Sequence, residues 1–69
     1  MTLYIYDADT LEIMAEVIAS TNAACEALAQ QQNYNPDQCS WTYNEPMPGI
    51  AGSLIDTGHH DVIRAEQKG

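Results

Sequence analysis

The residue types that bind metals gather near the C-terminus of this sequence. His59, His60 and Asp61 are adjacent, and Asp56 precedes them by a few residues. Imidazole and carboxylate groups are ligands for zinc and other transition metals. Adjacent residues on a strand point to opposite faces, so both histidines cannot easily hold one ion. The spacing favours ordinary histidines in a solvated tail, and we predict no metal and no cofactor. A small enzyme or metal protein built on His59, His60 and Asp56 stays an alternative.

Candidate nucleophiles lack the surroundings that catalysis needs. Cys25 and Cys39 have no Cys-x-x-Cys spacing and no basic neighbour that would activate a thiol. In a cytoplasmic protein we interpret them as buried free thiols, although whether they pair stays open. Ser53 is not set in a nucleophile-elbow glycine pattern. The glycine-containing stretch 48–52 has neither the lysine nor the following helix of a phosphate cradle. We therefore predict that the chain is not an enzyme.

The charge of the chain is strongly unbalanced. Its 69 residues include ten acidic and two basic ones, which gives a formal net charge of −8. This length predicts a single domain, residues 1–69. The cations, Arg64 and Lys68, both lie at the C-terminal end. Such a charge argues against direct binding to nucleic acid or to an anionic membrane. No apolar run reaches membrane-spanning length and the N-terminus does not resemble a secretory signal, so we predict a cytoplasmic location.

Acidity has two interpretations here. The acidic residues either keep a small protein soluble or form a surface that binds a basic partner. A typical soluble domain mixes both signs of charge on its surface. This chain has no Lys or Arg before Arg64, which favours the second interpretation. The carboxylates before that residue are Asp7, Asp9, Glu12, Glu16, Glu26, Asp37, Glu45, Asp56 and Asp61.

Hydrophobic periodicity predicts an α+β domain. Residues 3–6 and 11–18 alternate with a period of two and are joined by an Asp-rich turn at 7–10, which predicts an antiparallel hairpin. Candidate N-caps at 20–22 precede a predicted helix over 23–32. A third strand is predicted over 39–43, with Trp41 as the largest core residue. A fourth is centred on 53–56. Residues 58–69 form either a short edge strand or a loosely attached tail.

The predicted architecture has two layers. One helix packs on a three- to four-stranded antiparallel sheet, in the order β-β-α-β-β. Tyr4 and Tyr6 then lie on the outer, open face of the sheet, together with Glu12, Met14 and Glu16, if both hairpin strands bury their aliphatic residues. These are either simple surface tyrosines or part of an acidic, aromatic patch of the kind found in protein interfaces.

The chain as a whole resembles the small accessory proteins of phages and prophages. The features that carry this likeness are the opening strand Leu3-Tyr4-Ile5-Tyr6-Asp7, the Asp-rich turn, the Ala-rich helix and the strand Trp41-Thr42-Tyr43. Among these proteins the chain is most similar in size and charge to anti-CRISPR inhibitors. That resemblance implies an inhibitor that occupies the DNA-binding channel of a CRISPR effector, with carboxylates where phosphates would lie. It carries over no individual functional residue.

The charge argument reaches a compatible hypothesis from the residues themselves. We expect a monomer or weak dimer that binds a basic nucleic-acid-binding protein, such as a CRISPR effector subunit, by acidic DNA mimicry. The alternative is a self-associating or partner-binding structural module that uses an exposed strand edge. The predicted partner-binding residues are Asp7, Asp9, Glu12, Glu16, Glu26, Tyr4 and Tyr6.

Overall fold

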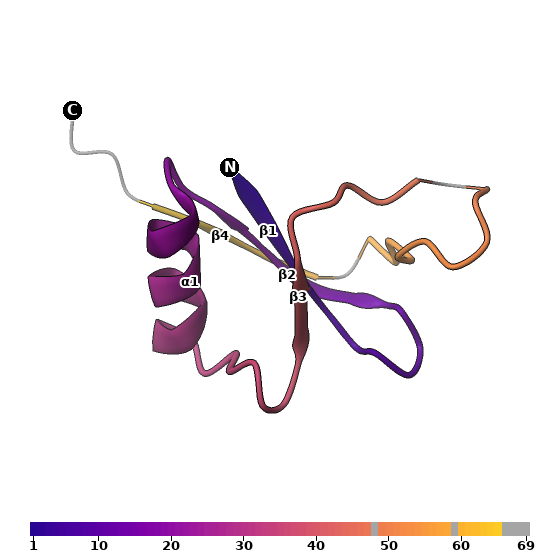
Figure 1. Cartoon of the computed structure of the whole chain (residues 1–69), viewed down its shortest axis with the longest axis horizontal. Coiled ribbons are helices and arrows are strands. Elements are labelled where there is room, and N and C mark those ends of the chain that lie inside the picture. The colour runs from indigo at the N-terminus through magenta and orange to yellow at the C-terminus, as the bar shows by residue number, and fades with distance from the viewer. Residues whose placement is uncertain (48, 59, 66–69) are drawn as a thin grey trace.

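The computed structural model describes residues 1–47, 49–58 and 60–65 of the chain and contains one helix and a four-stranded sheet. The strands lie in the order β3-β1-β2-β4. Figure 1 shows α1 on one side of the sheet and the long connection between β3 and β4 projecting away from the helix. The fold is therefore α+β, as predicted. The elements are β1 (Thr2–Tyr6), β2 (Ile13–Ile18), α1 (Asn22–Gln31), β3 (Ser40–Thr42) and β4 (Asp61–Arg64).

The β1–β2 hairpin is antiparallel, with Leu3 opposite Val17 and Ile5 opposite Ala15. Its connection is longer than the predicted turn, and β2 begins at Ile13 instead of residue 11. The strand cannot begin earlier because Leu11 adopts a left-handed φ of 65°, which a strand residue does not. Asp7 stabilises the start of the connection, since its Oδ1 accepts a hydrogen bond from the backbone N–H of Asp9 at 2.8 Å.

The helix begins where the capping residues predict. Thr21 is the N-cap, and its hydroxyl oxygen accepts a hydrogen bond from the N–H of Ala24 at 3.1 Å. Cys25 and Ala29 are the buried helix residues, one turn apart. Because both are small, the helix backbone can lie close to the sheet. The helical face therefore contributes little apolar volume, and the sheet supplies most of the core.

The core lies between α1 and the sheet. Its largest fully buried side chains are Leu3, Ile5, Val17 and Cys25. Trp41, predicted to be the principal core residue, is only partly buried and packs against the edge of this cluster. β3 is an edge strand, paired on one side with β1, so Trp41 has no further strand to cover its outer edge.

The prediction of an entirely antiparallel sheet is wrong, because β4 runs parallel to β2. The connection after β3 accounts for the difference. β3 ends at Thr42, opposite Tyr4, and the chain then returns to the start of β2, where Ile55 forms a parallel bridge with Glu12. It therefore enters β4 from the same end of the sheet as β2 and runs in the same direction.

The fourth strand lies later in the chain than residues 53–56, where it was predicted. Within that stretch only the isolated bridge of Ile55 is formed. Asp61–Arg64 joins the sheet as β4, where Ile63 packs against the core. The N–H of Ala65 extends the pairing with a hydrogen bond of 2.9 Å to the carbonyl of Ile18. This part of the predicted tail is a strand, while residues 66–69 lie outside the described part of the chain.

Within the described ranges, no helix combines the length and the apolar character that crossing a membrane requires.

Candidate functional site

The outer face of the sheet, on the side away from α1, is covered near its centre. Tyr4 lies there as predicted, but it is 9% exposed instead of open to solvent. Its register neighbours are Glu16 on β2 and Thr42 on β3. Burial raises the pKa of the Tyr4 phenol, and the carboxylates of Glu16, Glu45 and Asp56 raise it further. The expectation of an open face is therefore wrong at Tyr4, because the chain between β3 and β4 brings Glu45 and Asp56 towards it.

Glu16, His60 and Asp56 form what we call the histidine cluster. The His60 side chain is 7% exposed, and its Nε2 contacts a carboxylate oxygen of Glu16. Its Nδ1 lies 3.4 Å from Oδ1 of Asp56, beyond good hydrogen-bond geometry. When Glu16 is ionised it only accepts hydrogen bonds, so the ring then donates to it through Nε2–H. The cluster thus ties the chain before β4 to the middle of β2.

The predicted metal-ligand group is only partly assembled. His60 and Asp56 come together, but Asp61 instead accepts a hydrogen bond from the Tyr34 hydroxyl at 3.2 Å. His59 lies outside the described residues. Among residues 1–47, 49–58 and 60–65, no group of three or more His, Cys, Asp or Glu side chains is arranged to hold a metal ion.

Sequence reasoning paired His60 with Asp56 but missed Glu16, the group in direct contact with the ring. These two residues are 44 positions apart in the chain. Their contact follows from the parallel register of β2 and β4, in which Glu16 lies opposite Val62. No sequence pattern indicated that β2 and β4 pair in parallel, and the predicted sheet was antiparallel. The cluster was therefore not predictable before the strand direction was known.

A second group of carboxylates lies at the hairpin end of the sheet. Asp7, Asp9 and Asp37, which we call the acidic end, line one shallow hollow of about 240 Å³. All of them are exposed. They meet because Tyr6, the last residue of β1, lies opposite Ser40, the first residue of β3. The segment after β1 and the segment before β3 are therefore neighbours.

No lysine or arginine lines this hollow; its other lining residues are Ala8, Pro36, Gln38, Cys39 and Ser40. Asp37 was recognised in the sequence as one of many carboxylates, but it was not predicted to belong with Asp7 and Asp9. Their meeting depends on the antiparallel pairing of β1 with β3, which no local sequence pattern specifies.

Apart from Glu12, the structure does not place the other predicted partner-binding residues on one surface with the acidic end. Glu16 belongs to the histidine cluster on the outer face, where Tyr4 is also buried. Tyr6 lines a hollow beneath the β3–β4 connection. Glu12 is exposed and forms the bridge to Ile55, and its carbonyl oxygen accepts a hydrogen bond from the N–H of Asp7 at 3.0 Å, so it adjoins the acidic end. Glu26 is on α1, on the opposite side of the sheet from Tyr4.

Two tyrosines bind carboxylates within the fold. The Tyr43 hydroxyl donates to Glu26 over 2.9 Å and lies 3.3 Å from the carbonyl oxygen of Asn22, so it joins the end of β3 to α1. Burial raises the pKa of Tyr43 to about 12, and the hydrogen bond and charge of Glu26 contribute. Burial and the hydrogen bond to Asp61 likewise raise the pKa of Tyr34.

Both cysteines are free thiols. Cys25 is buried in the helix–sheet core, with its Sγ 3.5 Å from the carbonyl oxygen of Val17. Cys39 is partly buried against the core. The interpretation of the pair as buried free thiols is therefore confirmed for Cys25, whereas Cys39 is free but only partly buried.

No protein-family model, no curated protein and no solved structure matches this chain. Functional inference therefore rests on the geometry and charge described above.

Proposed function

We propose that this chain is an inhibitory binding protein that occupies the basic nucleic-acid-binding surface of another protein. In this proposal its carboxylates lie where phosphates of DNA or RNA would lie. The partner class that the sequence resemblance implies is a CRISPR effector of the host cell. The chain would act as a competitor and would need no cofactor.

The acidic end is the observation that carries the proposal. Asp7, Asp9 and Asp37 are exposed carboxylates from two connections that the sheet brings together around one hollow. Carboxylates spaced in this way can pair with several Arg or Lys side chains of a basic groove, and Arg pairs with carboxylate through two parallel hydrogen bonds. The net charge of −8 would accelerate encounter with such a groove at low ionic strength.

The acidic end is a better candidate contact than the carboxylates inside the fold. Glu16 already contacts His60, and Glu26 already accepts a hydrogen bond from Tyr43. Using either for a partner would break an existing interaction, which would offset part of the binding energy. The carboxylates of the acidic end contact a partner at less cost, although Asp7 also supports its own turn.

The test is competition with DNA on a purified CRISPR effector–guide complex. The wild-type chain is titrated into the complex bound to labelled target DNA, and displacement is followed by fluorescence anisotropy at several salt concentrations. We expect displacement at low salt that weakens steeply as salt is added. The triple variant Asp7→Asn/Asp9→Asn/Asp37→Asn should need at least about a tenfold higher concentration to displace the same amount of DNA. Each charge-assisted pair that it loses contributes about 1 kcal/mol or more to binding.

A matched control separates local recognition from bulk charge. The variant Glu26→Gln/Glu45→Gln/Asp61→Asn removes the same number of charges away from the hollow that the acidic end lines. If it loses as much competition as the acidic-end variant, affinity follows net charge alone and the acidic end has no special role. If the wild-type chain binds the complex without displacing DNA, or binds equally at all salt concentrations, the mimicry proposal is wrong.

Assembly of the chain with itself is the other candidate function, and the sheet edges are where it would occur. β3 has three residues and β4 has four, and β4 carries Asp61 and Arg64. Short strands with charged side chains are a common way of discouraging edge pairing. Light scattering at low and high salt distinguishes the two functions, because a stable, salt-insensitive homodimer would favour assembly.

A further inference from the structure

The connection between β3 and β4 exposes apolar side chains to solvent. Met47 is 61% exposed, Ile50 is 60% exposed and Ile55 is 49% exposed. We call these residues the apolar loop surface. Single exposed apolar residues are ordinary on proteins, but several on one connection of a small acidic chain form a local patch.

The backbone around this surface is held in place by hydrogen bonds. The Ser53 hydroxyl accepts a hydrogen bond from the N–H of Met47 at 2.6 Å, and the N–H of Ile50 donates to the carbonyl of Met47 at 3.1 Å. Ile55 makes two backbone hydrogen bonds to the hairpin. Its N–H donates to the carbonyl of Leu11 at 2.7 Å, and its carbonyl accepts from the N–H of Ile13 at 2.9 Å. Backbone that is hydrogen-bonded at these points loses little conformational entropy there when a partner binds.

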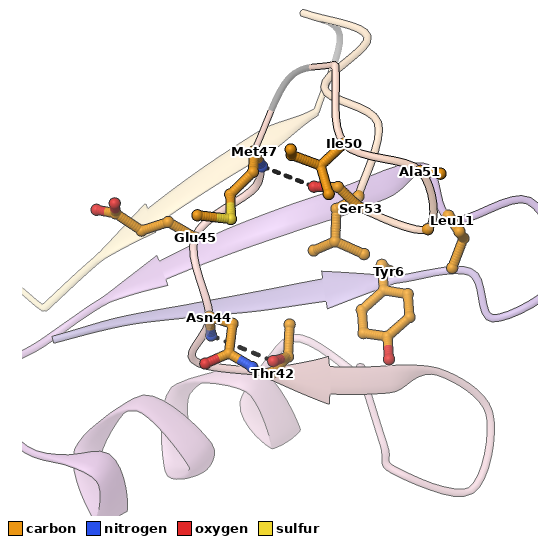
Figure 2. Close-up of a pocket in the computed structure, with 11 residues that line it drawn as sticks. Tyr6, Leu11, Thr42, Asn44, Glu45, Met47, Ile50, Ala51 and Ser53 are labelled. Atoms are coloured by element: carbon orange, nitrogen blue, oxygen red, sulfur yellow. Dashed lines mark hydrogen bonds between the residues drawn. The ribbon is translucent and has the colours of Figure 1, made fainter.

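Two adjacent hollows flank the surface. The first, of about 330 Å³, lies between the connection and the sheet, where Tyr6 and Leu11 form part of its wall (Figure 2). The second, of about 370 Å³, lies along Pro46 and Ile55. Met47 and Ile50 line both hollows. A partner could therefore place apolar side chains on either side of these residues.

The charges around the hollows are negative. Glu45 lines the first hollow and Asp56 lines the second. Arg64 is the one lysine or arginine that the structure describes. In the strand register it lies opposite Ile18, at the far end of β2, whereas Ile55 of the connection is hydrogen-bonded to Ile13, at the start of β2. Five residues of strand separate these points, a distance of about 17 Å. The surface therefore combines an apolar centre with a carboxylate rim.

We infer that the apolar loop surface is a second docking site, which binds a basic protein segment carrying apolar side chains. The segment's aliphatic or aromatic groups would enter the hollows beside Met47 and Ile50, and its Arg or Lys groups would meet Glu45 and Asp56. An anionic membrane and a nucleic acid are repelled by the same carboxylates. The inference goes beyond charge mimicry, because a surface that only imitated phosphate would need no apolar centre.

Two synthetic peptides with equal numbers of Arg test the inference. One alternates Arg with Leu, and the other alternates Arg with Ser. Binding of each to the full chain is measured by isothermal titration calorimetry, and the readout is the ratio of the two affinities. We expect the Arg–Leu peptide to bind the wild-type chain at least about tenfold more tightly than the Arg–Ser peptide.

Variants locate this preference on the molecule. Met47→Ser/Ile50→Ser should bring the affinity ratio close to one while leaving Arg–Ser binding unchanged. The control Met14→Ser/Val62→Ser removes exposed apolar side chains elsewhere and should keep the wild-type ratio. Circular dichroism confirms that each variant is folded. The inference is overturned if the wild-type ratio is already near one, or if the control lowers the ratio as much as the loop variant.

The same experiment keeps the two proposals separate. The variant Asp7→Asn/Asp9→Asn/Asp37→Asn should weaken the Arg–Ser peptide, which has only charge to bind with, more than the Arg–Leu peptide, whose Arg groups meet Glu45 and Asp56 at the loop. Their ratio should therefore stay at the wild-type value or rise. If this variant has no effect on either peptide, the acidic end is not a contact for cations, yet the ratio still reports on the apolar loop surface. If instead the variant abolishes the ratio, the preference for Leu arises at the acidic end and the loop inference is wrong.

Discussion

At the scale of single residues, carboxylates in this chain serve two different purposes. Some contact a hydroxyl or imidazole group from another part of the fold: Glu26 contacts Tyr43, Asp61 contacts Tyr34 and Glu16 contacts His60. Such pairs join segments that are far apart in the chain, in a protein that has only two basic residues with which to form salt bridges. The remaining exposed carboxylates do not join distant segments in this way, and under the proposed function they are the groups that would meet a basic partner.

Tyr43 makes stability dependent on alkaline pH. Its pKa in the folded state is raised to about 12, above the ordinary value of 10.0, so folding favours the neutral phenol. This contribution is fully present below about pH 10 and is lost as the pH rises through about 12. Urea unfolding of the wild type should show a falling free energy of unfolding over that range.

The variant Tyr43→Phe should be less stable than the wild type near neutral pH, because the hydrogen bond to Glu26 is lost. It should also lose less stability on going to alkaline pH. The fall does not vanish in the variant, since the pKa values of Tyr4 and Tyr34 are raised as well. Identical pH profiles for the two proteins would contradict the assignment of this dependence to Tyr43.

His60 should be important for stability although it lies near the end of the chain. Its ring is almost fully buried and contacts Glu16, so His60→Ala leaves both a cavity and a half-buried carboxylate without its donor. We expect the free energy of unfolding to fall by about 2 kcal/mol in chemical denaturation. Asp37→Ala, an exposed carboxylate, serves as the control and should change stability by less than about 0.5 kcal/mol. Equal effects of the two substitutions would show that the histidine cluster does not anchor β4.

At the scale of elements, β4 is the strand whose attachment can be tested most directly. Ile63 packs against the core, whereas its neighbour Val62 is about half exposed on the outer face. Ile63→Ala should therefore lower the free energy of unfolding by about 2 kcal/mol, and Val62→Ala by less than about 0.5 kcal/mol. Hydrogen exchange should show loss of protection in β4 for the first variant only. Similar exchange in both variants would mean that the strand is not held by its core face.

Local signals predicted the elements that depend on local chemistry. The period of two from Leu3 to Tyr6 and the capping at Thr21 gave correct positions for β1 and for the start of α1, within a residue. The positive φ of Leu11 was not predictable, because leucine rarely adopts it without tertiary contacts, here the hydrogen bond from Ile55 to its carbonyl.

The choice of the fourth strand depended on non-local pairing. Residues 53–56 and residues 61–64 both contain strand-forming residues, and nothing local distinguishes them. The direction of β4 follows from the path of the connection after β3, which the sequence does not reveal. For the same reason the contact of Glu16 with His60 and the meeting of Asp37 with Asp7 could not be placed beforehand, although each residue was recognised as a carboxylate or a histidine.

At the scale of the whole molecule, charge opposes folding. With a net charge of −8 and nearly all exposed charges of one sign, the folded state brings carboxylates closer together than the unfolded chain does. Added sodium chloride screens this repulsion, with a Debye length of about 10 Å at 0.1 M. We therefore expect the free energy of unfolding in urea to rise by several tenths of a kcal/mol or more between low and moderate salt.

The acidic end should account for a local part of this salt dependence. Asp7, Asp9 and Asp37 share one hollow, so their mutual repulsion is greater than that of carboxylates spread over the surface. The variant Asp7→Asn/Asp9→Asn/Asp37→Asn should be more stable than the wild type at low salt, and its stability should rise less as salt is added. A variant that instead loses stability at low salt would show that these carboxylates stabilise the fold. That role would account for their presence without a binding partner. A gain in stability together with a loss of binding to a basic partner would identify the acidic end as a surface that trades folding free energy for recognition.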